Sequence, residues 1–457
     1  MTPKEILLAA MRHEETPITP WVPFAGVHAG SLLGYDAKSV LTDADKLYES
    51  LLEVNKLYLP CGLPIMFDLQ MEAEILGCDL VWSETGPPFV SSHPLEESGS
   101  VPCLCNLPQK EDGRLPVALD VMHRLKKSIG NDVALYGLIC GPFTLASHLR
   151  GTNIFMDMYD DEDYVKDLVE YCAAVCKRIS DFYIEAGMDV IALVDPMVSQ
   201  ISSDHFQEFF SSAFSDIFKH IRAQGVFSSF FVCGDATRNI EAMCQTRPDS
   251  VAIDENIELL EAKKITDKYN ITLCGNIPLT TVMLHGSQQD NIKCAIDLMD
   301  AVGQKRNFIL APGCDMPYAL PAANSIAIAQ TVWQTDSMRQ LLENYVADQD
   351  EFEVILPDYE NLNKPLIEVF TLDSTACAAC TYMMASARDM EELFGDKIEI
   401  VEYSSTLKEN IVRARQMGVD HLPSIYINGQ LKFSSLIPDK NKFAQHVKEA
   451  IKEIEAK

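Results

Sequence analysis

Short apolar segments alternate with longer amphipathic segments along the first three quarters of the chain. Each short segment is rich in β-branched or aromatic residues, and the stretch after it has helical periodicity, which is typical of a strand followed by a helix. Eight strands that alternate with helices favour an α/β fold of the (β/α)8 barrel type over an open sheet. The predicted strands are residues 21–24, 62–67, 133–140, 189–194, 227–233, 250–253, 271–274 and 308–311.

Two local patterns add detail to this alternation. Thr2-Pro3-Lys4-Glu5 has the form of a capping box with proline at the first helical position, and it predicts a helix that ends near His13. Residues 85–116 contain Pro, Ser and Gly without a clear period, so we expect an excursion from the barrel there. Within it, Cys103-Leu104-Cys105 has spacing too tight for a standard structural zinc pair.

The C-terminal part of the chain has a different order of elements. After a helical run that includes Met338, an acidic stretch without a period extends to Pro365, which predicts a barrel over 1–340, a linker over 341–364 and a second domain over 365–457. Strand, helix, strand, helix, two strands and a final helix are the βαβαββα order of a smaller thioredoxin-like domain. The predicted strands of this domain are residues 367–371, 398–403, 424–427 and 431–433.

A CxxC motif, Cys377-Ala378-Ala379-Cys380, follows the first strand of this domain. A thiol at the start of a helix is stabilised as thiolate by the unpaired backbone amides, so Cys377 is the candidate nucleophile and Cys380 the resolving thiol of a redox-active dithiol. Leu422-Pro423 lies just before a predicted strand, and it resembles the cis-proline loop of thioredoxins. The alternatives are half of a zinc site or a coincidental pair.

Composition and charge limit the partners. The chain is 47% hydrophobic and 23% charged, as in an ordinary folded protein, and its net charge is −30. Residues 1–364 hold 26 Lys+Arg against 53 Asp+Glu, so the acidity belongs to the barrel, and a nucleic-acid partner is not expected. The N-terminus lacks the apolar core of a signal peptide and no run of eighteen apolar residues occurs, so we expect a cytoplasmic protein without a membrane partner.

Polar residues follow most of the predicted barrel strands. Active sites of (β/α)8 barrels lie at the carboxyl ends of the strands, so these residues are the candidates for chemistry. Three cysteines on one rim are the most unusual feature among them. The strand-end residues are Asp68, Asp195, Cys233, Asp254, Cys274 and Cys314, with His28 and His148 just beyond two other strands.

Six segments around these positions resemble one family in the family's own order. They look like the uroporphyrinogen decarboxylase superfamily, and within it the methylcobalamin:coenzyme M methyltransferase branch, over roughly residues 1–335. The segments are Phe67-Asp68 followed by Glu72-Ala73-Glu74-Ile75-Leu76-Gly77-Cys78, then Gly141-Pro142-Phe143-Thr144-Leu145-Ala146, Asp195-Pro196, Cys233-Gly234-Asp235, Gly275-Asn276-Ile277 and Gly313-Cys314-Asp315-Met316-Pro317.

The resemblance implies a zinc ion held by a His-x-Cys pair and a later Cys, with a substrate thiol in the open position. Cys233 and Cys314 match the two sulfur ligands, but Phe231 occupies the position of the histidine. Cys274 is the candidate third ligand, and a metal-free site of bare thiols is the alternative. Oxygen or nitrogen ligands are also open, from Asp195, Asp254, Glu72 or His28.

The resemblance implies a corrinoid-dependent methyltransferase that moves a methyl group between methylcobalamin and a thiol or other small acceptor. No Asp-x-His-x-x-Gly motif occurs, so the corrinoid is expected on a separate carrier protein. In this interpretation Asp195 is catalytic, and the substrate is bound by His28, Asp68, Glu72 and His148.

Two other functions, and a catalytically inert binding protein, compete with methyl transfer. One is a thiol-disulfide oxidoreductase whose barrel serves recognition. The other is a uroporphyrinogen decarboxylase-like lyase, which is disfavoured because residues 1–113 hold a single arginine, Arg12, whereas a polycarboxylate substrate demands several.

Overall fold

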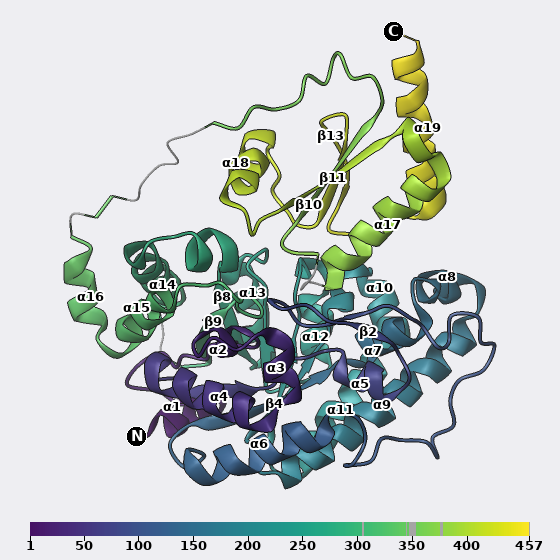
Figure 1. Cartoon of the computed structure of the whole chain (residues 1–457). Helices are drawn as coiled ribbons and strands as arrows, with labels where there is room; N and C mark the ends of the chain where they lie inside the picture. Colours follow the sequence, from purple (N-terminus) through teal and green to yellow (C-terminus); the bar gives the residue numbers. More distant parts are fainter. Residues whose placement is uncertain (304–305, 344, 347–352, 375–377, 457) are drawn as a thin grey trace. The chain divides into compact units, whose positions relative to one another are not determined.

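The computed structural model describes residues 1–456 except 304–305, 344, 347–352 and 375–377 (Figure 1). The chain folds into two compact units, Met1–Tyr345 and Val346–Lys457. None of the helices within the described residues is long and apolar enough to span a membrane.

The first unit is built on a parallel sheet in which strands that follow one another along the chain are neighbours in space. The order is β1-β4-β5-β6-β7-β8-β9, and every pairing is parallel. Parallel neighbours need a crossover between them, which explains the alternation of apolar strands and amphipathic helices. The strands are β1 (Gly62–Ile65), β4 (Ala134–Cys140), β5 (Val190–Val194), β6 (Phe227–Phe231), β7 (Ser250–Ala252), β8 (Thr272–Ile277) and β9 (Phe308–Pro312).

The predicted first strand, residues 21–24, is reduced to one bridge. Trp21 pairs in parallel with Leu310 of β9, and the Trp21 carbonyl accepts the Cys61 N–H at 2.8 Å, just before β1. The segment therefore lies between the two edge strands and closes the sheet. Pro20 precedes this segment and Pro23 lies within it, and proline has no N–H for a ladder, so the predicted strand is shortened to this bridge in its expected place.

Helices surround this sheet (Figure 1). The predicted capping box is confirmed, because the Glu5 N–H donates to Thr2 Oγ1 at 3.2 Å and the Thr2 N–H donates to Glu5 Oε2 at 2.8 Å. The helices are α1 (Pro3–Met11), α2 (His28–Ser31), α3 (Ala37–Thr42), α4 (Ala44–Tyr58), α5 (Met71–Ile75), α6 (Leu115–Ser128), α7 (Pro142–Arg150), α8 (Asn153–Asp160), α9 (Glu162–Glu185), α10 (Ser203–His205), α11 (Ser211–Ala223), α12 (Ile240–Gln245), α13 (Leu259–Tyr269), α14 (Gln288–Val302), α15 (Ala322–Trp333) and α16 (Thr335–Leu341).

The segment between α5 and α6, residues 76–114, contains all but the last two residues of the excursion predicted over 85–116. It contains a short antiparallel pair, β2 (Leu80–Val81) and β3 (Phe89–Val90). Arg150 of α7 anchors the loop that follows, because its Nη1 donates to three backbone carbonyls within residues 95–98, at 2.6 to 3.0 Å. Further along this loop a disulfide joins Cys103 and Cys105.

The second unit has a four-stranded sheet of order β11-β10-β12-β13, in which β11 is parallel to β10 and the other pairings are antiparallel. A cis peptide bond joins Leu422 and Pro423, immediately before β12. A buried cluster that includes Ile367, Met383 and Phe443 forms its core. The elements are β10 (Leu366–Thr371), α17 (Ala378–Phe394), β11 (Glu399–Ser404), α18 (Lys408–Met417), β12 (Ser424–Ile427), β13 (Gln430–Ser434) and α19 (Lys440–Glu455).

Candidate functional site

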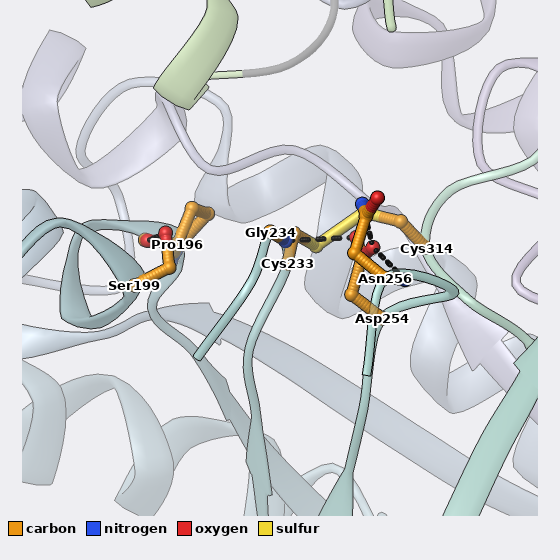
Figure 2. The surroundings of a disulfide bond; sticks show 7 residues. All are labelled: Pro196, Ser199, Cys233, Gly234, Asp254, Asn256 and Cys314. Carbon is orange, nitrogen blue, oxygen red and sulfur yellow. Dashed lines mark hydrogen bonds between the residues drawn. A yellow bond between two sulfur atoms is a disulfide. The ribbon is translucent and has the colours of Figure 1, made fainter. Parts of the chain in front are cut away.

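A disulfide joins Cys233 and Cys314 at the carboxyl end of the parallel sheet (Figure 2). Cys233 lies two residues after β6, Cys314 two residues after β9, and their Cα atoms are 5.9 Å apart. Strands β6 and β9 are separated by β7 and β8, so the bond crosses from one part of the sheet to another. Cys233 is buried, at 5% exposed, whereas Cys314 is partly exposed, so only one of the two cysteines is enclosed.

Asp254, which follows β7, fixes the backbone after Cys233. Its Oδ2 accepts the Gly234 N–H at 2.8 Å, and its Oδ1 accepts the Asn256 backbone N–H at 2.9 Å and the Asn256 side-chain N–H at 2.6 Å (Figure 2). Gly234 has φ +86°, and a Cβ there would lie 2.8 Å from Ser199 Oγ, so glycine is required. In this structure the Asp254 carboxylate therefore positions the turn that holds Cys233.

Phe231 is the last residue of β6, and its side chain is fully buried. Its ring centroid lies 4.6 Å from that of Phe24 and 5.8 Å from that of Phe67, and those two rings are themselves 6.3 Å apart. We call these three rings the aromatic cluster. Because the cluster fills the position where the resemblance implies a histidine, no nitrogen ligand comes from this part of β6.

Cys274 lies inside β8 and not at its end, contrary to the sequence-based placement. Its backbone pairs with Ala252 on one side and Ile309 on the other, and burial raises the pKa of its thiol. The strand continues to Ile277, which the apolar run 271–274 did not indicate. Among the described residues no group of three or more His, Cys, Asp or Glu side chains is arranged to hold a metal ion.

Asp195 follows β5 and is fully buried. Its Oδ2 accepts the Phe143 N–H at 2.9 Å, and its Oδ1 accepts the Thr144 N–H at 3.1 Å and the Thr144 hydroxyl at 2.6 Å. These bonds pair the backbone N–H groups in the first turn of α7, which begins after Gly141 and has no N-cap side chain of its own. Burial raises the pKa of Asp195 to about 7, against the lowering effect of these donors.

Asp68, three residues after β1, lies in a buried ion pair that the sequence did not reveal. Arg114 Nη1 donates to Asp68 Oδ2, Arg114 Nε donates to Glu74 at 2.7 Å, and Asp68 Oδ1 accepts the Gln70 N–H at 2.8 Å. Arg114 precedes α6, at the far end of the excursion. Its distance of 46 residues from Asp68 explains why no sequence pattern linked the two.

Glu72 on α5 is fully buried without a charged partner of its own. Oε1 accepts the Cys140 N–H at 3.4 Å, and Oε2 has no hydrogen-bond partner among the described residues. Burial raises the pKa of Glu72 to about 8, so the carboxyl is mostly protonated at neutral pH. A protonated carboxyl in this position is a hydrogen-bond donor.

The two candidate histidines are both buried, and burial lowers their pKa values. His28 lies 2.6 Å from the Tyr58 hydroxyl through Nε2 and 3.2 Å from the Tyr318 carbonyl through Nδ1, and its pKa is lowered to about 4. Neither ring nitrogen of His148 has a hydrogen-bond partner among the described residues, and its pKa is lowered to about 3. Both imidazoles are therefore neutral at pH 7.

Asp315, next to Cys314, is a site residue that strand-end reasoning did not select. Its carboxylate lies against Gly26, which has φ +32° and where a Cβ would overlap it. Oδ1 is buried and has no hydrogen-bond partner among the described residues. The Gly313-Cys314-Asp315 sequence was the available signal, because a polar residue directly after a strand-end cysteine shares its location.

In the second unit, Cys377 lies outside the described residues, so the structure does not test its role. Cys380 lies on α17, is fully buried, and accepts the Leu372 N–H on its sulfur at 3.4 Å. The cis Leu422-Pro423 bond is present in the same unit, as the sequence predicted.

The parallel sheet with its sulfurs at the carboxyl end defines an α/β barrel-type protein with one candidate site at the barrel mouth. Residues 2–334 match the uroporphyrinogen decarboxylase (URO-D) family, so the chain belongs to that family.

Similar proteins bear methyltransferase names. The chain is 25% identical to the methylcobamide:CoM methyltransferase MtbA of Methanosarcina acetivorans over 332 residues, which is 71% of this chain and 95% of that protein. It is also 25% identical to MtbA of Methanosarcina mazei over 333 residues, with the same coverage. A solved methyltransferase structure from Methanosarcina mazei superimposes with a TM-score of 0.66 at 22% identity, covering 75% of this chain and 99% of that one, which supports the fold.

Proposed function

We propose that this protein transfers a methyl group between a corrinoid and a thiol or other small acceptor, at the barrel mouth. The observation that carries the proposal is the pair of sulfurs, Cys233 and Cys314, at the carboxyl ends of β6 and β9. Relatives that cover most of the family region are methylcobamide:CoM methyltransferases. Their names support methyl transfer as the reaction class.

The reaction sets a requirement on sulfur. In methyl transfer to a thiol, the sulfur lone pair attacks the methyl carbon, the carbon–cobalt bond breaks, and its electron pair stays on cobalt, so a thiolate is the reactive form. A disulfide has no thiolate to offer. The Cys233–Cys314 bond must therefore be opened before either sulfur takes part.

Zinc is the metal that the resemblance implies, and the residues present fit it incompletely. Cys233 and Cys314 supply two sulfurs, Phe231 supplies no ligand atom, and no third ligand joins them among the described residues. Structural and catalytic zinc sites use three or four protein ligands. We therefore derive no step through zinc. One cysteine thiolate of the opened pair takes the methyl group from cobalt as a thioether, and the acceptor then attacks that methyl carbon and releases the cysteine thiolate.

The second unit is proposed to be a thioredoxin-like domain that reduces this disulfide. Its element order and the buried Cys380 support this assignment. In the exchange, the Cys377 and Cys380 thiols are oxidised to a disulfide, and Cys233 and Cys314 gain the two electrons and two protons. A tethered reductant acts at high effective concentration.

A second function is favoured by the same disulfide. If the thiols of Cys233 and Cys314 act only in exchange, the protein is a thiol-disulfide oxidoreductase whose barrel recognises its substrate. The decarboxylase-like lyase stays disfavoured, because residues 1–113 hold a single arginine, Arg12, and Arg114 already pairs with Asp68 through Nη1 and with Glu74 through Nε.

The proposed partners follow from the reaction. The corrinoid is delivered by a separate carrier protein, and the acceptor is a small thiol or another small methyl acceptor. We further propose that the protein works in the cytoplasm, where thiols are kept reduced.

The test is to incubate the protein anaerobically with methylcobalamin and candidate thiols and to monitor demethylation through the cobalt absorbance. We expect turnover by the reduced wild type, and loss of at least about a hundredfold in Cys233→Ser and Cys314→Ser, because each removes a reacting sulfur. Cys294→Ser is the matched control, since Cys294 is a partly buried free cysteine on α14. Full activity in both serine variants, or none in the reduced wild type with any acceptor, would refute methyl transfer at this site, whereas retained disulfide exchange would support the oxidoreductase.

A further inference from the structure

The disulfide in the excursion loop, Cys103–Cys105, is exposed, whereas Cys233 of the Cys233–Cys314 pair is buried. Cys103, Leu104 and Cys105 are all exposed, and Leu104 is 52% exposed. Reaction of a disulfide requires access of an external thiolate to sulfur. The exposed pair meets that requirement without any rearrangement of the chain.

The same disulfide contributes little to the stability of the fold. Disulfides stabilise a protein mainly by restricting the unfolded chain, and the effect grows with the length of the closed loop. The two cysteines are separated by two positions, against 81 for Cys233–Cys314. A structural role for the Cys103–Cys105 bond is therefore the weaker explanation.

The local backbone holds the two cysteines close together. The Asn106 N–H donates to the Cys103 carbonyl at 2.9 Å, which closes a β-turn over residues 103–106. The Tyr171 hydroxyl on α9 donates to the Asn106 carbonyl at 3.3 Å and anchors the turn to the unit. The Cα atoms of the two cysteines are 5.2 Å apart in this arrangement.

One hydrogen bond distinguishes the two sulfurs. The Cys105 N–H donates to Cys103 Sγ at 3.2 Å. When the bond is open, this amide stabilises negative charge on Cys103, because a donor to an ionised acceptor makes a stronger hydrogen bond. Cys103 is therefore the attacking thiolate and Cys105 the resolving thiol.

A cavity of about 360 Å³ lies beside the turn. Pro102 and Asn106, which flank the two cysteines, line it together with apolar residues that include Ile75, Leu95 and Leu149. An apolar side chain next to a partner's disulfide can enter this space while the disulfide meets Cys103. The lining thus favours a peptide disulfide over a small polar one.

We propose that Cys103 and Cys105 form a thiol-disulfide exchange centre whose substrate is a peptide disulfide with a neighbouring apolar side chain. The Cys103 thiolate attacks the substrate disulfide and forms a mixed disulfide, and one substrate sulfur leaves as thiolate. Cys105 then attacks the Cys103 sulfur, closes the internal disulfide, and its proton passes to the released thiolate. The substrate gains two electrons, and an external dithiol restores the reduced pair.

This centre is independent of the proposed methyl transfer and of the second unit. The test therefore uses the full chain with Cys377→Ser and Cys380→Ser, so that exchange from the CxxC motif is absent. The reduced protein is incubated with oxidised glutathione, quenched with N-ethylmaleimide and analysed by peptide mass spectrometry. In this background, we expect glutathione to accumulate on Cys103 of the Cys105→Ser variant about threefold faster than on Cys105 of the Cys103→Ser variant. The difference is modest because the larger thiolate fraction of Cys103 is partly offset by the lower nucleophilicity of a more stable thiolate.

A second measurement tests the cavity. A peptide disulfide with phenylalanine beside the cysteine should oxidise the pair several times faster than the same peptide with glycine there. Cys294, a partly buried lone cysteine, gives the background rate of modification. The proposal is overturned if Cys103 reacts no faster than Cys294, if the two serine variants react equally, or if the phenylalanine and glycine peptides do not differ.

Discussion

Replacing Phe231 with histidine tests whether the aromatic cluster has taken the place of a metal ligand. Phe231 is fully buried and contacts the rings of Phe24 and Phe67. Losing two ring pairs costs about 1 kcal/mol each, and a buried imidazole N–H without a partner adds roughly 1–2 kcal/mol. Phe231→His should therefore lower the free energy of unfolding by about 3 kcal/mol in the absence of metal.

Zinc should reverse part of this loss. In the reduced protein, the new imidazole lies two residues before Cys233 and completes a set of one nitrogen and two sulfurs with Cys314. Binding to the folded state alone adds about 2.7 kcal/mol at a zinc concentration a hundred times the dissociation constant. Phe231→Leu is the matched control, because it also removes the ring pairs but adds no ligand.

The assay is urea unfolding of the reduced wild type and both variants, with and without zinc, together with metal analysis of each protein. We expect zinc-dependent stabilisation only in Phe231→His. Equal stabilisation of the wild type by one bound zinc would refute the reasoning, since a complete site would then exist with Phe231 in place. A histidine variant as stable as the wild type without metal would refute the assigned role of the aromatic cluster.

Three further predictions concern buried groups near the site. The pKa of Glu72 is raised from 4.5 to about 8, so between these pH values the folded state keeps a proton that the unfolded state has lost, and the free energy of unfolding falls as pH rises. Glu72→Gln should remove up to about 1.4 kcal/mol per pH unit of this slope, measured by urea unfolding between pH 5 and 8. An unchanged slope would contradict the raised pKa. Arg114→Ala should destabilise by about 3–5 kcal/mol, because it leaves Asp68 buried and unpaired, whereas the double change with Asp68→Ala should cost less than the two single changes added together. Gly26→Ala should lower the melting temperature, because its Cβ would overlap the Asp315 carboxylate. A melting temperature equal to that of the wild type would show that the carboxylate can move aside at no cost in stability.

The parallel sheet was predictable because its signal is local. Strands buried on both faces are continuous apolar runs, and seven of the eight predicted runs contain the observed strands or overlap them. The shortening of the strand at residues 21–24 has a local cause as well, since Pro20 and Pro23 each lack the N–H of a ladder residue. Cys274 was misplaced because an apolar run does not show where a strand ends when polar residues, here Asn276, continue it.

The contacts that define the site could be predicted only in part. Cys233 and Cys314 were selected because both follow strands and the carboxyl ends of parallel strands meet at one edge. Arg114 was missed, since its pairing with Asp68 depends on how the excursion folds back over the barrel. The surroundings of Asp195 were also hidden, because the donors that it accepts belong to the backbone of α7 and not to a side-chain motif.

Alternation along a strand connects the missing ligand to the disulfide. Residues 231 and 233 are two positions apart, so an extended backbone directs their side chains to the same face. The contacts of Phe231 with Phe24 and Phe67 show that this face is apolar up to the residue before the Cys233 turn. A cysteine pair beside such a surface has no nitrogen ligand to share a cation with, and its two sulfurs are close enough to bond to each other, as they do here. Phe231 thus leaves Cys233 and Cys314 without a nitrogen ligand from β6, and in this structure the two sulfurs are bonded to each other.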